Sequence, residues 1–418
     1  MLQLLGIVIF VIGLLVSIGL HELGHMVPAK KFGVRVSEYF VGFGPTLWSR
    51  KGKETEYGVK AIPLGGYVRL VGMIPPEEAV KPVKGHGRIA NIIADARSAS
   101  VDEVLDGEDY RAFYHLTWWR KVIVMFGGPF VNLVLAIVLF TVVQVGVGLP
   151  TANTTVFEVA SCVPATANAA CTSSDPASPA SVAGLEEGDT ITAVNGQPVE
   201  TWDDLTAILT ANPGAVVAIS VEREGETVEL TTTLASVERA GATVGYLGLV
   251  PGSELVRQGP LSGVETTVEY TGAVLKVIAT LPVAIYHAFL ATIGQEERDT
   301  TSVMGIVGVG RISGQIVAAD VEGYTLLLKT ADMLNLLAGL NLALFAFNMI
   351  PLVPLDGGHI ASALWQGIKN GWARLRRLPA PRPVDVARMM PLAYAVFGVL
   401  IVMGAVLVLA DILAPVSV

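Results

Sequence analysis

The side chains best suited to chemistry lie together in the short stretch His21-Glu22-Leu23-Gly24-His25. Because residues four apart share one face of a helix, the two imidazoles can bind the same zinc ion. Glu22 lies beside them, where its carboxylate can accept a proton from a water on that ion. A chain of this composition, with six histidines, would contain H-E-x-x-H by chance roughly 0.005 times. The stretch therefore predicts a catalytic metal site.

The third ligand must come from elsewhere, since a catalytic zinc ion usually has three protein ligands and a water. No ligand-type residue follows His25 closely, but a later stretch, Asn348 to His359, reads N-M-I-P-L-V-P-L-D-G-G-H. Its Asp356 is the only acidic residue between Asp332 and Asp385. We predict that Asp356 is the third ligand.

Two alternatives stay open for this later stretch. Asp356 could instead cap the helix that follows it, and His359 could be the ligand in its place. In either case the prolines and the Gly357-Gly358 pair interrupt the helix. Backbone groups freed in this way are tolerated at membrane depth only where they face protein or a water-filled cavity. A hydrated metal site would provide such a cavity.

The elements that must position these residues are membrane helices. Of the 418 residues, 52% are apolar and only 16% are charged, and the mean hydropathy is +0.58, which excludes an ordinary soluble globular protein. Four apolar runs are long enough to span a bilayer, namely about Leu4–Met26, Val122–Val145, Met333–Leu352 and Pro391–Leu413. A fifth, Thr271–Gly294, contains Lys276, Pro282 and His287. We expect it to lie at the membrane surface, which leaves a polytopic α-helical membrane protein with four spans.

Positive charge sets the expected orientation. Lys30 and Lys31 follow the first span and Arg120 and Lys121 precede the second, so the positive-inside rule places the loop between them in the cytoplasm and the N-terminus outside. The third span returns the chain to the cytoplasm, where the basic loop Lys369–Arg388 precedes the fourth span and leaves the C-terminus outside. The segment from 150 to 330, with 21 acidic and 7 basic side chains, is thereby exported.

This topology brings the two chemical stretches together. The third span ends on the cytoplasmic side, so Asp356 is expected at the same depth as His21 and His25. Ionisable residues at membrane depth are costly and usually functional. The net charge of −9 offers no extended basic surface, so we exclude nucleic acid as a partner.

H-E-x-x-H in the first span together with N-x-x-P-x-x-x-L-D-G in a later one resembles the site-2 proteases, the intramembrane zinc metalloproteases of regulated intramembrane proteolysis. The resemblance implies that His21, His25 and Asp356 bind one zinc ion per chain and that Glu22 is the catalytic acid and base. It also implies that Asn348 handles the substrate or the developing oxyanion.

Three further stretches extend the resemblance to the bacterial branch of this family, including the regulator of sigma-E protease type: Gly42–Pro45, Ile62–Val68 and Gly127–Asn132. Gly305–Val309 departs from the pattern, because a proline is expected after its first glycine. The branch implies a multi-pass protein of the bacterial plasma membrane. Its implied substrate is a single-span membrane protein such as an anti-sigma factor, trimmed first by an upstream site-1-type protease. A remnant signal peptide is a further candidate substrate.

The exported segment carries another signature. Gly184–Gly196 reads G-L-E-E-G-D-T-I-T-A-V-N-G, which is similar to the G-L-x-x-G-D-x-I-x-x-V-N-G of PDZ domains. We expect an extracytoplasmic α+β PDZ domain over residues 150–252, with a helix at Trp202–Leu209 and strands at Val216–Arg223 and Thr227–Leu234. Such a domain either binds peptides by strand addition or serves only as a steric plug over the protease.

The rest of the chain divides around this domain. Residues 1–149 hold the first two spans, 253–331 an extracytoplasmic amphipathic connector and 332–418 the last two spans, while 74–110 read as a cytoplasmic loop. Cys162 and Cys171 lie in the exported segment, where a disulfide is permitted. Their spacing does not show whether they are bridged.

A membrane-associated β-hairpin is expected between the first two spans. Glu54 to Gly72 alternates polar and apolar residues around Pro63, which predicts a hairpin that dips to the depth of the metal site. Its open edge at Gly65, Gly66 and Tyr67 is a candidate to pair with an unwound substrate. The alternative is that the hairpin only packs against the spans.

Two functions of other classes fit the same features. A metal transporter would use His21, His25 and Asp356 as a transit site and would not need Glu22. A PDZ-containing membrane adaptor with an inactive protease core would not need zinc.

Overall fold

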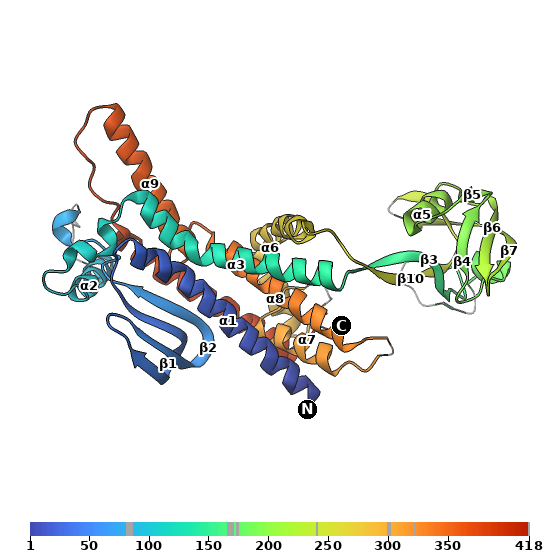
Figure 1. The fold of residues 1–418 in the computed structure, drawn as a ribbon, viewed down its shortest axis with the longest axis horizontal. Coiled ribbons are helices and arrows are strands. Elements are labelled where there is room, and N and C mark those ends of the chain that lie inside the picture. The colour runs from blue at the N-terminus through green and yellow to red at the C-terminus, as the bar shows by residue number, and fades with distance from the viewer. Residues whose placement is uncertain are drawn as a thin grey trace. The chain divides into compact units, whose positions relative to one another are not determined.

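The computed structural model of the chain describes residues 1–80, 87–164, 171–172, 175–239, 241–298, 302–321 and 323–416. It consists of two compact units, one formed by Met1–Val145 with Gly259–Val418 and the other by Gly146–Gln258 (Figure 1). The first unit contains the long apolar helices, and the second contains most of the strands.

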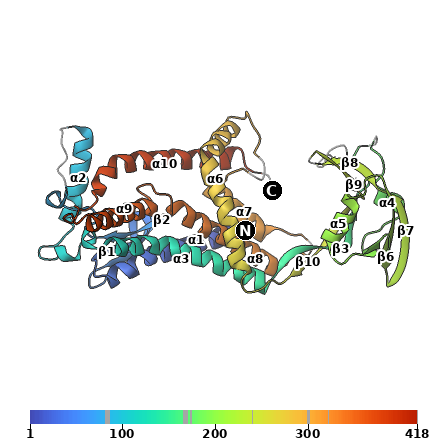
Figure 2. The same cartoon turned by 90° about the horizontal axis from the view of Figure 1, so that it is seen from above.

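Five described helices are long and apolar enough to cross a membrane. Four of them match the predicted spans: α1 (Leu2–Lys31), α3 (Trp118–Gly146), α8 (Leu326–Asn348) and α10 (Met390–Leu413). The fifth, α6 (Ser262–Thr292), covers the stretch predicted to lie at the membrane surface. Figure 2 shows α6 running roughly perpendicular to α3 and α10, and Figure 1 views it almost end-on. By length and composition the chain thus has one helix more than the four spans predicted.

Glycines set the distance between α1 and α3. A Cβ atom on Gly24 would lie 2.3 Å from the carbonyl oxygen of Gly127, and one on Gly127 would lie 2.0 Å from that of Gly24. Neither position can accept a side chain, so the two backbones are in direct contact. Small residues at such crossings allow the close packing that holds helices together in lipid. This contact fixes α3 beside the two histidines of α1.

Two long strands, β1 (Val36–Lys51) and β2 (Glu56–Leu70), form the sheet next to α1. β1 pairs with both halves of β2, so that Val41 lies opposite Val59 on one side and Gly66 on the other. Each strand is therefore bent, and part of each strand pairs on both of its sides. Gly42, at φ +95°, adopts a conformation that favours glycine and permits such a bend.

The predicted hairpin at Glu54–Gly72 is wrong in its bounds. The turn lies at residues 52–55, and Pro63 and Gly65 are inside β2 rather than at a turn. Gly65 has φ +141°, so the chain changes direction there without leaving the strand. The sequence pattern also missed β1, the partner strand.

Short elements complete this unit. The segment read as a cytoplasmic loop contains a helix, α2 (Arg88–Asp102), whose Arg97 forms a buried ion pair of 2.9 Å with Asp385. The chain also forms α7 (Ile306–Ala318) and α9 (Asp356–Leu375). Gly305–Val309, where the sequence departs from the family pattern, is the start of α7.

The second unit is a small α+β domain with its own apolar core. Its main sheet has the order β10-β3-β4-β6-β7, with β5 at the side of β4 and a separate ribbon of β8 and β9. The elements, in chain order, are β3 (Leu149–Val159), α4 (Pro179–Ala183), β4 (Thr190–Val194), β5 (Gln197–Pro198), α5 (Trp202–Thr210), β6 (Val216–Arg223), β7 (Glu226–Thr233), β8 (Ala235–Arg239), β9 (Ala242–Tyr246) and β10 (Leu249–Val256). The helix and the two strands predicted in this region are confirmed.

One ion pair ties the predicted signature to the sheet of this unit. Asp189, with only 1% of its side chain exposed, accepts hydrogen bonds from Arg223 Nε at 2.7 Å and Nη2 at 2.8 Å. Although burial raises the pKa of Asp189, these bonds and the backbone N–H of Glu186 hold it below its ordinary value. The turn that carries Asp189 is thereby fixed to β6.

A disulfide joins Cys162 and Cys171, whose Cα atoms lie 5.9 Å apart. The sequence had left this pairing open. The bridge closes a short loop of the second unit, and it is the state expected of cysteines in an oxidising compartment.

These two cysteines permit a direct chemical test, because the chain has no others. We expect the purified, unreduced protein to take up no maleimide and the reduced protein to take up two per chain, as measured by mass spectrometry. Cys162→Ser should leave Cys171 reactive without reduction. Two labels on the unreduced wild type would show that the bridge is absent.

Candidate active site

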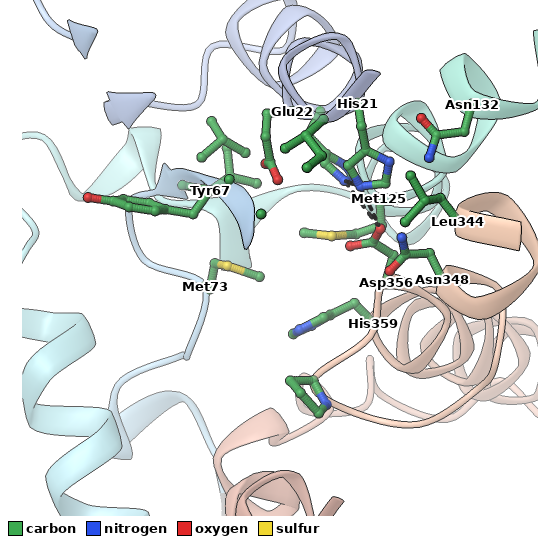
Figure 3. A pocket seen from close by; sticks show the side chains of 17 residues that line it. His21, Glu22, Tyr67, Met73, Met125, Asn132, Leu344, Asn348, Asp356 and His359 are labelled. Atoms are coloured by element: carbon green, nitrogen blue, oxygen red, sulfur yellow. Dashed lines mark hydrogen bonds and ion pairs between the residues drawn. The ribbon is translucent and has the colours of Figure 1, made fainter. Parts of the chain in front are cut away.

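The structure brings the three predicted ligands together. Nε2 of His21 lies 3.2 Å from Nε2 of His25, and the Oδ2 atom of Asp356 lies 3.4 Å and 3.3 Å from these two nitrogens (Figure 3). Donor atoms on a four-coordinate zinc ion are about 3.3 Å apart at bond lengths near 2 Å. The three donor atoms are therefore spaced as three ligands of a tetrahedral zinc ion would be.

The donor set also fits zinc chemically. Two imidazole nitrogens and one carboxylate oxygen are a ligand set that leaves a fourth position for water or substrate. His21 and His25 are buried, and Asp356 is half-buried. Among the described residues, these three side chains form the one cluster that could hold a metal ion.

Helix α3 orients the second histidine. Nδ1 of His25 lies 2.8 Å from the carbonyl oxygen of Val124, a group that can only accept a hydrogen bond. Nδ1 must therefore carry the proton, and the lone pair of Nε2 is left for the metal.

A glycine of α3 leaves room for the metal. A Cβ atom on Gly128 would lie 2.3 Å from Nε2 of His25 and 2.8 Å from Nε2 of His21. Any side chain at this position would displace the two donor nitrogens. Gly128 belongs to a stretch noted for family resemblance, but the sequence did not indicate that it faces the histidines.

Asp356 reaches the histidines because the chain turns sharply after α8. It is the first residue of α9, and the N-cap position is Leu355, so the alternative in which Asp356 caps this helix is wrong. Cβ atoms on Gly357 and Gly358 would lie 2.3 Å and 2.5 Å from backbone atoms of Ile350 and Val353. The Gly-Gly pair is therefore what allows the loop to fold back on itself.

The cluster lies in a cavity of about 410 Å³. Glu22 lines this cavity next to the histidines, and so does Val68 of β2. The predicted pairing residues Gly65, Gly66 and Tyr67 line the cavity as well, and so does Asn348. His359 lines it from α9 but is outside the ligand cluster.

Asn132 is the polar lining residue for which the sequence suggested no role. It lies in α3, is 0% exposed, and interrupts an apolar span with an amide. A polar residue at membrane depth was the signal that could have marked it.

A histidine-histidine-aspartate site among helices long and apolar enough to span a membrane defines the class of an intramembrane metallopeptidase. Residues 9–387 match the sequence profile of "Peptidase family M50". The chain belongs to this family, the site-2 proteases, and is a zinc metalloprotease and a multi-pass membrane protein.

Curated relatives agree with this assignment. The chain is 33% identical to "Zinc metalloprotease Rip1" of Mycobacterium tuberculosis, over 100% of this chain and 99% of the relative. It is 27% identical to "Zinc metalloprotease RasP" of Oceanobacillus iheyensis, over 84% and 88%. A solved PDZ domain of an SdrC-like protein from Listeria monocytogenes covers 25% of this chain and 93% of that domain at 16% identity. Its TM-score of 0.18 adds no support to the fold assignment.

The space beside Gly128 gives a prediction for metal binding. Gly128→Ala places a methyl group where the donor nitrogens lie, and zinc ligand positions tolerate shifts of only about 0.2 Å. We expect the zinc affinity of the purified protein to fall at least about 100-fold, as measured by competition with a chelator. Gly146→Ala, in the same helix and with no atom within 4 Å of the added Cβ, should bind zinc like the wild type. Full zinc binding by Gly128→Ala would contradict this geometry.

Proposed function

We propose that this protein is an endopeptidase that cuts the membrane-spanning segment of a single-span protein inside the bilayer. The observation that carries the proposal is the placement of Glu22 and the edge of β2 around one metal-type cluster in one cavity. These are the parts needed to hydrolyse a peptide bond and to hold an extended substrate.

In this proposal His21, His25 and Asp356 hold one zinc ion per chain. When bound, zinc polarises the scissile carbonyl and lowers the pKa of a water molecule. Glu22 accepts the proton of that water at its carboxylate and passes it to the leaving amine. Asn348, which lines the same cavity, donates its amide N–H to the oxygen on which negative charge develops.

The edge of β2 serves as the docking strand. A substrate helix must unwind before cleavage, because its amides are bonded internally, and unwinding leaves polar groups that need partners in lipid. Residues 66–70 of β2 pair with β1 on one side, and no other described strand pairs with them, so their other edge is open. At this open edge, the N–H and C=O of Gly66 are proposed to pair with the substrate.

The orientation follows from charge. The N-terminus, the unit Gly146–Gln258 and the C-terminus are extracytoplasmic, and the disulfide of that unit suits an oxidising compartment. In this proposal α6 lies along the outer membrane surface, because a fifth crossing would place the basic loop Lys369–Arg388 outside the cell. This arrangement keeps the basic loop Lys369–Arg388 in the cytoplasm of a bacterial cell.

The partners are proposed from the family. The substrate is a single-span regulator such as an anti-sigma factor, which an upstream site-1-type protease has shortened on the outer side. The PDZ-like unit binds an extended segment or excludes untrimmed proteins. Lipid is the third partner, since the long helices expose apolar side chains such as Ile12 and Phe397.

Replacing Glu22 separates the protease from its rivals. Glu22→Gln removes the proton acceptor, and cleavage of a panel of single-span substrates should fall about 10²- to 10⁴-fold while zinc binding persists. A chelator should abolish wild-type cleavage, and added zinc should restore it. Glu265→Gln, an exposed change in α6, is the matched control and should cleave normally.

Two outcomes would favour other functions. Equal activity of wild type and Glu22→Gln with zinc bound would exclude the protease mechanism. Zinc flux across vesicles that survives the Glu22→Gln change would instead indicate a transporter.

Strand pairing at β2 predicts a period of two. Competitive peptide inhibitors should be N-methylated at one amide at a time and their inhibition constants compared. Each lost hydrogen bond contributes about 1 kcal/mol, so affinity should fall about fivefold at alternate residues and little at those between. Uniform effects along the peptide would mean that the substrate does not add a strand to β2.

A further inference from the structure

Among the described residues, the carboxamide of Asn132 has no hydrogen-bond partner. It is 0% exposed, and neither Oδ1 nor Nδ2 is within bonding distance of another polar atom among the described residues. A buried polar group without a partner destabilises the folded protein, because it loses its hydrogen bonds to water. An apolar side chain at this position would give a more stable fold, so the amide is expected to have a function.

A second unpartnered atom lines the same cavity. Nδ1 of His21 is buried and has no partner in the described part of the chain, whereas Nδ1 of His25 is held by the carbonyl oxygen of Val124. Metal-binding histidines almost always donate their second nitrogen to an acceptor, which fixes the tautomer and the ring orientation. His21 is thus the ligand whose orienting acceptor is missing.

The packing of α3 on α1 shows where this acceptor must come from. Gly128 contacts both imidazoles, and Asn132 is one helical turn further along the same face of α3. His21 is likewise one turn from His25 along α1. The carbonyl oxygen of Val124 accepts a hydrogen bond from His25. Asn132 is the polar residue of this face beyond Gly128, on the side of His21.

The close view supports this pairing. Figure 3 shows Asn132 beside His21, with Glu22 and Tyr67 on the other side of that histidine. Asn132 lines the cavity from α3 and not from the edge where the substrate is proposed to bind. Asn132 therefore lies next to the His21 ligand, on the side away from the proposed substrate edge.

We propose that Asn132 is a positioning residue for the metal centre. Its Oδ1 accepts a hydrogen bond from the Nδ1–H of His21, directly or through one water, so that the Nε2 lone pair points to the zinc ion. The proposal rests on the ligand set given under the proposed function. It concerns metal affinity and ligand orientation and assigns Asn132 no contact with the substrate.

The test measures zinc affinity of the purified full-length protein by chelator competition. Asn132→Leu keeps the approximate size but removes the acceptor, and we expect zinc binding to weaken about 10- to 100-fold. Asn132→Asp keeps an acceptor oxygen and should bind zinc within a few-fold of the wild type. The visible spectrum of the cobalt-substituted protein should change in Asn132→Leu, because the ring of His21 is no longer fixed.

A matched control distinguishes positioning from simple packing. Asn341 in α8 is also 0% exposed, but its Nδ2 donates to the hydroxyl of Ser17 at 3.0 Å. Asn341→Leu should lower the unfolding temperature without changing zinc affinity. Asn132→Leu should lower zinc affinity without lowering the unfolding temperature.

Three results would overturn the inference. Wild-type zinc affinity in Asn132→Leu would do so, as would an equal loss in Asn132→Asp. A changed KM with unchanged zinc affinity would show instead that Asn132 contacts the substrate. If the wild type itself binds no zinc, the ligand assignment of the proposed function fails, which is a different outcome from a failure at Asn132 alone.

Discussion

The contact between α1 and α3 is the interaction on which the site depends. Gly24 and Gly127 bring the two backbones together, and no side chain fits between them. The same contact places the carbonyl oxygen of Val124 against one histidine and leaves the space beside Gly128 for a metal ion. His25 therefore owes its orientation to α3, and both histidines owe their free volume to it. The metal centre therefore requires the small residues at this helix contact as well as the donor atoms.

The second constraint is the need to satisfy polar backbone at membrane depth. The chain meets it by confining irregular structure to places that face the cavity. The turn between α8 and α9 exposes backbone groups where Asp356 enters the site, and the edge of β2 does so where Gly66 lies. Both irregular segments surround the same space. The candidate metal ligands and the β2 residues Gly65 to Val68 thus line one cavity.

The metal ligands could be predicted from the sequence because their types are rare and their spacing is local, as in His21 and His25, or because few rivals exist, as for Asp356. The hairpin could not be placed correctly, because Gly65 bends a strand that the alternation pattern reads as ending. The roles of Gly128 and Asn132 could not be predicted for another reason. Their roles come from contacts between α1 and α3, and a single sequence gives no distance between two helices.

The division into two units leaves the candidate active site within one of them. His21, His25, Asp356 and Glu22 all belong to the unit formed by Met1–Val145 and Gly259–Val418. The second unit begins and ends with β3 and β10, which pair antiparallel, so both of its connections leave as one ribbon. At the root of this ribbon Gln144 donates to the hydroxyl of Thr266 at 2.8 Å, which joins the end of α3 to the start of α6. Because α3 also carries Gly128, this bond helps to hold the helix that shapes the metal centre whatever the second unit binds.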